Sequence, residues 1–172
     1  MKLSRVLTFL VAGCLPILTY SQTFYIVRHA EKAQGSTGAT MNTTADPPLT
    51  RAGELRAEAL RNILKDKHIH HIFSTNTKRT LSTAQPLSHA IGVEPEIYSS
   101  ADDDFITRLK KLDRNVLVVA HSNTVDDIVN SLSGDVKVSG DLPDSEYDNL
   151  YVVAYKKKKV LFAAKKYGRL SN

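Results

Sequence analysis

Cysteine is nearly absent from this sequence of 172 residues, and its one cysteine is Cys14. Residues 22–172 therefore have no means of forming a disulfide, a cysteine-ligated zinc site or a cysteine nucleophile. The sequence also lacks internal repeats and long low-complexity tracts. Its hydrophobic fraction of 42% and charged fraction of 24% are ordinary for a globular protein. Length and composition together predict one domain with one buried core.

The first 21 residues have the layout of a secretory signal peptide. Lys2 and Arg5 form a positive start, and a mostly apolar run from Val6 to Leu18 follows. That run is too short for a comfortable membrane span. We therefore predict cleavage after Ser21, which leaves a domain of residues 22–172 exported to the periplasm or the extracellular space.

Two other interpretations of this segment remain open. Val11-Ala12-Gly13-Cys14 resembles a lipobox, in which a lipidated Cys14 would anchor the protein to a membrane. The short apolar stretch before Cys14 and the apolar residues 15–18 after it argue against this. A buried N-terminal helix is disfavoured because Pro16 would break it. Unless Cys14 is lipidated, we expect no contact with a membrane.

Positive charge is in modest excess. Lys2 and Arg5 contribute two charges to the formal net charge of +5, and lysines at 156–159 and 165–166 contribute much of the rest. This balance suits a small anionic substrate. We expect the run at 156–159 to be a solvated hairpin turn whose charge keeps the sheet edge from pairing, with no nucleic-acid partner.

Apolar residues recur in a pattern that predicts strands alternating with helices. Thr50 is placed to cap a helix that begins at Arg51, and Gly92 is placed to end a helix that begins near Lys78. A three-layer α/β sandwich around a mainly parallel sheet is the predicted fold. The predicted strands are 23–27, 69–74, 115–120, 150–155 and 160–165; the predicted helices begin near 51, 78, 103 and 124; a loop is predicted at 33–45.

Polar clusters follow three of the predicted strands. They are Arg28-His29, residues 74–79 and residues 121–123. Ligands of open α/β sheets bind outside the carboxyl ends of the strands. We therefore expect two arginines and two histidines to meet at one edge of the sheet.

Four sequence elements around these clusters resemble the histidine phosphatase superfamily, also called phosphoglycerate mutase-like, and in particular its small members with a minimal domain. The resemblance runs from about Phe24 to Gly168. Ala30 stands where the family usually has glycine, and we expect the backbone to tolerate the added methyl group. The elements are Arg28-His29-Ala30-Glu31-Lys32, Leu49-Thr50-Arg51-Ala52-Gly53, Ser74 to Thr80 with Thr83-Ala84, and Val118 to Asn123.

The resemblance implies a role for each polar residue. His29 attacks phosphorus and carries the phosphoryl group, with one ring nitrogen unprotonated and the other fixed by a hydrogen bond. Arg28 and Arg79 grip the phosphoryl oxygens with their guanidinium groups, and His121 is a further donor. No metal or other cofactor is required, because the arginines supply the positive charge.

The proton donor for the leaving oxygen has several candidates. Asp102 is our choice, by analogy with family members whose acid follows the second arginine, although capping of a helix is an equal alternative for it. Some small members have no dedicated acid. Ser74 and Asn123 are predicted to line the pocket, with a turn or cap role as the alternative. The other candidate acids are Asp103, Asp104, Glu94 and Glu96.

Three functions fit these features. The first is a phosphohydrolase that passes the phosphoryl group of a small phosphate monoester from His29 to water. The second is a phosphoglycerate mutase-type phosphotransferase, although the chain looks too short for the segments that mutases insert. The third is a non-catalytic module that binds a phosphorylated ligand. The sequence carries no signal for the substrate's identity or for the oligomeric state.

Overall fold

A computed structural model describes residues 21–33, 46–157 and 159–171. The predicted signal segment, including Cys14 and except Ser21, lies outside the described residues. The greater part of the loop predicted at 33–45 lies outside them too. Within the described residues, no helix is long and apolar enough to cross a membrane.

The described residues form a six-stranded sheet with the order β3-β2-β4-β1-β5-β6. The first four strands along the chain pair in parallel, and the C-terminal hairpin of β5 and β6 adds to β1 in antiparallel fashion. The predicted mainly parallel sheet is confirmed. The strands are β1 (Ser21–Arg28), β2 (Ile69–Ser74), β3 (Pro95–Ile97), β4 (Asn115–Ala120), β5 (Asn149–Lys156) and β6 (Lys159–Lys166).

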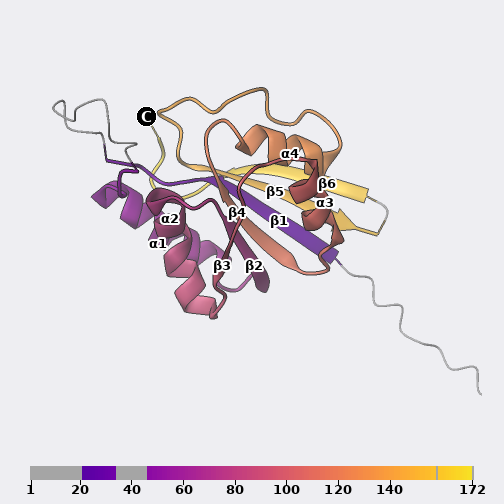
Figure 1. Ribbon diagram of the computed structural model, residues 1–172, viewed down its shortest axis with the longest axis horizontal. Helices are drawn as coiled ribbons and strands as arrows, with labels where there is room; N and C mark the ends of the chain where they lie inside the picture. The colour runs from indigo at the N-terminus through magenta and orange to yellow at the C-terminus, as the bar shows by residue number, and fades with distance from the viewer. Residues whose placement is uncertain (1–20, 34–45, 158, 172) are drawn as a thin grey trace, which may run out of the picture.

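Helices cover both faces of the sheet, which makes the three-layer arrangement visible in Figure 1. On one face, Phe24 packs in a cluster with Leu109 and Ile128 from α3 and α4. On the other face, Val27 packs in a cluster with Leu60 and Leu87 from α1 and α2. The helices are α1 (Arg51–Leu64), α2 (Lys78–Ile91), α3 (Asp103–Lys111) and α4 (Val125–Ser133).

Local signals in the sequence set the ends of these helices. The Thr50 side chain accepts a hydrogen bond from the backbone of Gly53 and so caps α1, as predicted. Gly92 ends α2 in the left-handed conformation (φ 68°), which costs glycine little. α2 runs from Lys78 to Ile91 with Pro86 inside it.

The pairing of the strands brings the predicted site residues to one edge. Arg28 at the end of β1 is the register partner of Ala120, the last residue of β4, and Ser74 at the end of β2 is the partner of Val119. His29 and His121 each follow directly after these strands. The carboxyl ends of β1, β2 and β4 therefore lie side by side, as the polar clusters predicted.

Candidate active site

Two backbone carbonyls hold His29 at the end of β1. Its backbone N–H donates to the carbonyl of Ala120, 2.9 Å away. Its ring Nδ1 lies 2.8 Å from the Ala30 carbonyl. Because a carbonyl can only accept, Nδ1 carries the proton and Nε2 keeps its lone pair. The predicted fixing of one ring nitrogen is therefore present, and the partner is a backbone carbonyl.

The ring of His121 lies against that of His29, with centroids 5.4 Å apart and an edge-on geometry. Nε2 of His121 is 2.8 Å from the Thr75 hydroxyl, and Nδ1 is 3.5 Å from Nη2 of Arg79. Since Arg79 can only donate, His121 Nδ1 accepts and its Nε2–H points to Thr75. Thr75 was part of the motif quoted above, but its contact with His121 was not foreseen.

Both imidazoles are kept neutral by their surroundings. Burial is the largest cause and lowers the pKa of His29 to about 3. The hydrogen bond to Ala30 opposes this effect, and electrostatic interactions with Arg28, His121 and Arg79 add to it. Burial, followed by the charge of Arg79, lowers the pKa of His121 to about 4. A neutral imidazole is the form that can act as a nucleophile.

The lowered pKa of His29 predicts an effect of acid on stability. An unfolded His29 gains its proton near pH ~6.5, whereas the folded one stays neutral down to about pH 3. In that window the unfolded state binds more protons, so the free energy of unfolding falls as the pH falls. We expect urea unfolding of His29→Asn to lose less stability between about pH 7 and pH 4.5 than the parent loses. Equal losses in the two proteins would contradict the lowered pKa.

Arg28 is buried, with 2% of its side chain exposed, and it holds a loop from the C-terminal half of the chain. Nη1 donates to the carbonyls of Pro143 and Glu146, and Nη2 forms an ion pair with Asp144 at 3.0 Å. The guanidinium lies 4.2 Å from the centre of the Tyr147 ring. The ring centroids of Tyr147 and His29 are 6.0 Å apart, so this loop borders the site. It carries no helical or strand periodicity, so its role was missed in the sequence.

Arg79 is the second residue of α2 and is paired with Asp46. Its Nη1 is 3.2 Å from the Asp46 carboxylate, whose other oxygen accepts from the backbone N–H of Lys78 at 2.7 Å. Among the described residues, Nε of Arg79 and Nε of Arg28 are both buried without a hydrogen-bond partner. A buried donor without a partner costs about 1–3 kcal/mol, so an anion that reached these two groups would be stabilised.

A close approach between α1 and the segment after His29 fixes the position of that segment. A Cβ on Gly53 would lie 2.4 Å from the Glu31 carbonyl, so only glycine fits here. Arg56 is 4% exposed and binds both carboxylate oxygens of Glu31, at distances of 2.7 to 3.0 Å. The Thr83 hydroxyl accepts from the backbone N–H of Ala30. These contacts restrain the backbone that follows His29.

The remaining predicted residues take different places. The Asp102 carboxylate accepts from the backbone of Phe105 and caps α3, the alternative that the sequence left open. Ser74 is fully buried and donates to the Thr75 carbonyl, which is a turn role. Asn123 is exposed in the turn before α4. The structure brings Arg28, His29, Arg79 and His121 together, whereas a contact of Asp102, Ser74 or Asn123 with a substrate stays a prediction.

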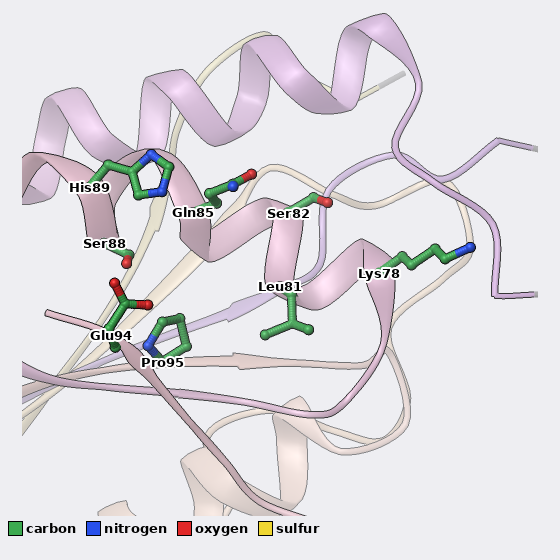
Figure 2. A pocket seen from close by; sticks show the side chains of 8 residues that line it. All are labelled: Lys78, Leu81, Ser82, Gln85, Ser88, His89, Glu94 and Pro95. Atoms are coloured by element: carbon green, nitrogen blue, oxygen red, sulfur yellow. The ribbon is translucent and has the colours of Figure 1, made fainter.

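A pocket of about 340 Å³ runs along α2 toward the start of β3. Figure 2 shows Lys78 at one end of it and His89 and Glu94 at the other. Lys78 is the neighbour of Arg79 in the sequence, but neither Arg79 nor a site histidine lines this pocket. The pocket is therefore separate from the group of arginines and histidines.

Comparison with known proteins gives a family. The model of the histidine phosphatase superfamily (branch 1) matches residues 24–104, a range that includes Arg28, His29 and Arg79. The probable phosphoglycerate mutase GpmB of Citrobacter koseri is 31% identical over 130 residues, which are 71% of this chain and 54% of that protein. The protein of the same name from Escherichia coli O139:H28 is 32% identical over 101 residues, 59% of this chain and 43% of that protein. The chain thus spans about half the length of these relatives.

Solved structures share the fold. The protein histidine phosphatase SixA complexed with tungstate aligns with a TM-score of 0.64 and 17% identity, over 84% of this chain and 96% of that one. A mycobacterial glucosyl-3-phosphoglycerate phosphatase aligns with a TM-score of 0.58 and 13% identity, over 85% of this chain and 98% of that one. On the family model and the relatives, the chain belongs to the histidine phosphatase superfamily, branch 1.

Proposed function

We propose that this protein is a metal-independent phosphohydrolase that cleaves a small phosphate monoester through a phosphohistidine on His29. The observation that carries the proposal is the state of His29. Its Nδ1 is committed to the Ala30 carbonyl and its pKa is lowered to about 3, so Nε2 offers a lone pair at neutral pH. Two arginines stand beside it, each with a buried Nε that lacks a partner among the described residues.

The chemistry proceeds in two displacements. Nε2 of His29 forms a bond to phosphorus as the bond to the leaving oxygen breaks, and that oxygen takes a proton. Water then attacks the phosphohistidine, the N–P bond breaks, and inorganic phosphate leaves. The transferred group spreads negative charge over its equatorial oxygens, and guanidinium groups stabilise that charge.

The phosphoryl group would take positions that aspartates now hold. Asp144 occupies Nη2 of Arg28 and Asp46 occupies Nη1 of Arg79. Asp144 has 90% of its side chain exposed and can swing into water, so a phosphoryl dianion would displace it at little cost. The proton donor stays a prediction for Asp102. On the layout of residues 1–21 we further propose that the protein acts outside the cytoplasm.

A phosphotransferase of the phosphoglycerate mutase type is the second candidate, and the similarity to GpmB favours it. Both candidates form the same phosphohistidine and differ in the acceptor. Phosphoenzyme carrying ³²P and offered 3-phosphoglycerate would release label as inorganic phosphate in a hydrolase. The label would appear in a bisphosphate or in 2-phosphoglycerate in a mutase.

Hydrolysis of p-nitrophenyl phosphate by the full chain, with a chelator and no added metal, tests the hydrolase directly. We expect turnover, since the leaving group is good enough to depart without strong acid assistance. A panel of small phosphate monoesters would then rank substrates. Absence of turnover on every member of the panel, together with tight binding of orthophosphate, would favour the non-catalytic binding module instead.

Gly53→Ala should lower both activity and stability. The new methyl group meets the Glu31 carbonyl at 2.4 Å and must push apart α1 and the segment after His29. Overpacking of this kind costs about 1–3 kcal/mol. A misplacement of His29 by about 1 Å lowers kcat by roughly 10²-fold. Urea unfolding and steady-state kinetics measure the two effects.

Gly92→Ala is the matched control. It also puts a methyl group on a glycine, and its φ of 68° makes it destabilising, but nothing lies within 4 Å of the new atom and Gly92 is at the far end of α2. It should lose about 1 kcal/mol of stability and keep its kcat. If both variants lose activity to the same extent, the effect reflects stability alone and the positioning role of Gly53 is wrong.

A further inference from the structure

The end of the sheet opposite the candidate active site is strongly basic. The loop from α1 to β2, the loop from α3 to β4 and the turn from β5 to β6 all lie there, because β2, β4 and β1 are parallel and β5 runs against them. We call this surface the lysine end. Its exposed cations are Lys65, Lys67, Lys110, Lys111, Arg114, Lys156, Lys157 and Lys159.

Hydrogen bonds tie these loops together at the first residue of β4. The Asn115 side chain donates to the Lys67 carbonyl at 2.7 Å and accepts from the backbone N–H of Thr23 at 2.9 Å. On the other side of β1, Ser21 is the register partner of Lys156, which in turn pairs with Lys159. The three segments that carry the basic residues therefore neighbour one another at this end of the sheet.

Fewer acidic than basic residues lie at this end of the sheet, where Glu94 precedes β3 and Asp135 follows α4 and pairs with Lys137. Asp66 and Asp113 are the acidic residues within these same segments, and Asp113 is paired with Arg114 at 3.7 Å. In the part of the chain that the structure describes, none of the seven lysines of the lysine end forms an ion pair. A dense, unpaired positive surface attracts an anionic partner.

Aliphatic side chains stand beside the lysines. Val160 is 49% exposed and Leu161 is 46% exposed at the start of β6. A hollow beside the turn is lined by Leu161 together with Lys156, Lys157 and Lys159. Lysine stems can lie along an apolar surface while their charged ends reach outward. This mixture of exposed aliphatic and basic groups is typical of surfaces that enter the interface of an anionic bilayer.

The chain enters the described structure at the same place. Residues 1–20 join Ser21, which lies beside Lys156 at the lysine end, and Figure 1 shows β1 beginning next to the β5–β6 turn. The sequence of that segment contains the apolar run from Val6 to Leu18. A membrane that held this apolar run during export, or a lipid on Cys14, would meet the described structure at the lysine end.

The sequence alone predicted no contact with a membrane unless Cys14 is lipidated. From the arrangement of these residues we propose instead that the lysine end docks on the surface of an anionic lipid bilayer, which leaves the candidate active site on the side facing away from the membrane. The exposed aliphatic pair distinguishes this partner from nucleic acid, whose binding surfaces are rich in arginine and aromatic side chains. Arg114 is the one arginine of the lysine end, and residues 65–68, 110–114 and 156–161 include no Phe, Tyr or Trp.

The test changes the hairpin lysines alone. Lys65, Lys110 and Lys111 lie at the C-terminal ends of helices, where the helix dipole already favours cations, so they give a less clear result. We would measure sedimentation of the full chain with phosphatidylcholine vesicles and with vesicles containing roughly 30% phosphatidylglycerol. Residues 1–20, with Lys2 and Arg5, are common to every sample, so a change in vesicle preference between the parent and a variant reports the substituted surface.

The full chain should bind anionic vesicles at least about tenfold more tightly than neutral ones, and salt should reduce the difference. The triple variant Lys156→Glu, Lys157→Glu and Lys159→Glu should lose that preference. A second triple variant, Arg51→Glu, Lys165→Glu and Arg169→Glu, makes the same change of charge at exposed positions of the other end and should keep it. Leu161→Ser should weaken binding to anionic vesicles about threefold or more.

Three results would overturn the proposal: equal binding to both vesicles, an equal loss in the two triple variants, or binding of a DNA duplex without binding of anionic vesicles. Circular dichroism of each variant shows whether it is folded. None of these results depends on catalysis, so failure of the membrane proposal leaves the proposed hydrolase standing.

Discussion

Replacement of His29 by asparagine should abolish phosphatase turnover, lowering kcat by at least about 10⁴-fold. The size of the effect follows from the loss of the nucleophile, since the covalent step has no substitute once Nε2 is gone. The surrounding arginines and His121 would still bind the phosphoryl group. We therefore expect orthophosphate to bind His29→Asn within a few-fold of the parent, as measured by calorimetry, while turnover is lost.

Asparagine is the informative replacement because it preserves the contact that holds His29. Its amide N–H can donate to the Ala30 carbonyl, as Nδ1 of His29 does at 2.8 Å. The site is buried, so alanine would leave both a cavity and an unpaired carbonyl. A folded His29→Asn protein that retains more than about 1% of parental kcat would show that another group attacks phosphorus.

Arg79→Lys should lower kcat/KM by roughly 10²–10³-fold, which is the second largest effect we expect. Lysine keeps the charge but loses the planar fork and its Nε, the group that is buried without a partner among the described residues. The ion pair with Asp46, at 3.2 Å in the parent, would also change its geometry. Steady-state kinetics on the best substrate of the panel measures the loss.

The neighbouring imidazole offers an independent readout for Arg79. The pKa of His121 is lowered first by burial and next by the charge of Arg79. Arg79→Gln should therefore raise that pKa, which a titration of the imidazole protons by NMR would detect. Arg51→Lys is the matched control, because Arg51 is 79% exposed and pairs with Glu54 within α1. Full activity in Arg79→Lys would exclude a role for the guanidinium in phosphoryl transfer.

Much of the fold is readable from local signals. Thr50 caps α1 and Gly92 ends α2 where the sequence placed them, since caps depend on a single residue and its immediate backbone. The buried strands were found because they are continuous apolar runs. β3 was missed: three residues that begin with Pro95 are too few to show a period.

In the candidate site, too, the residues carried by local motifs could be predicted, whereas contacts between distant segments could not. The grouping of Arg28, His29, Arg79 and His121 could be predicted because motifs of a known family carry them and the ends of the strands lie at one edge. The loop that Arg28 holds through Pro143, Asp144 and Glu146 depends on contacts more than a hundred residues apart in sequence, which no local pattern encodes. The Asp102 carboxylate caps α3, which is the alternative that the sequence offered, and its role as the proton donor stays a prediction.

Rapid quenching of the protein during turnover of a ³²P-labelled monoester tests the central proposal most directly. We predict a protein-bound label in the parent that is stable to alkali and lost in acid, as expected for an N–P bond, and that maps to the peptide containing His29. It should form and decay at rates compatible with kcat and be absent from His29→Asn. Steady turnover in the parent without such a label, or label that persists in His29→Asn, would contradict a phosphohistidine on His29.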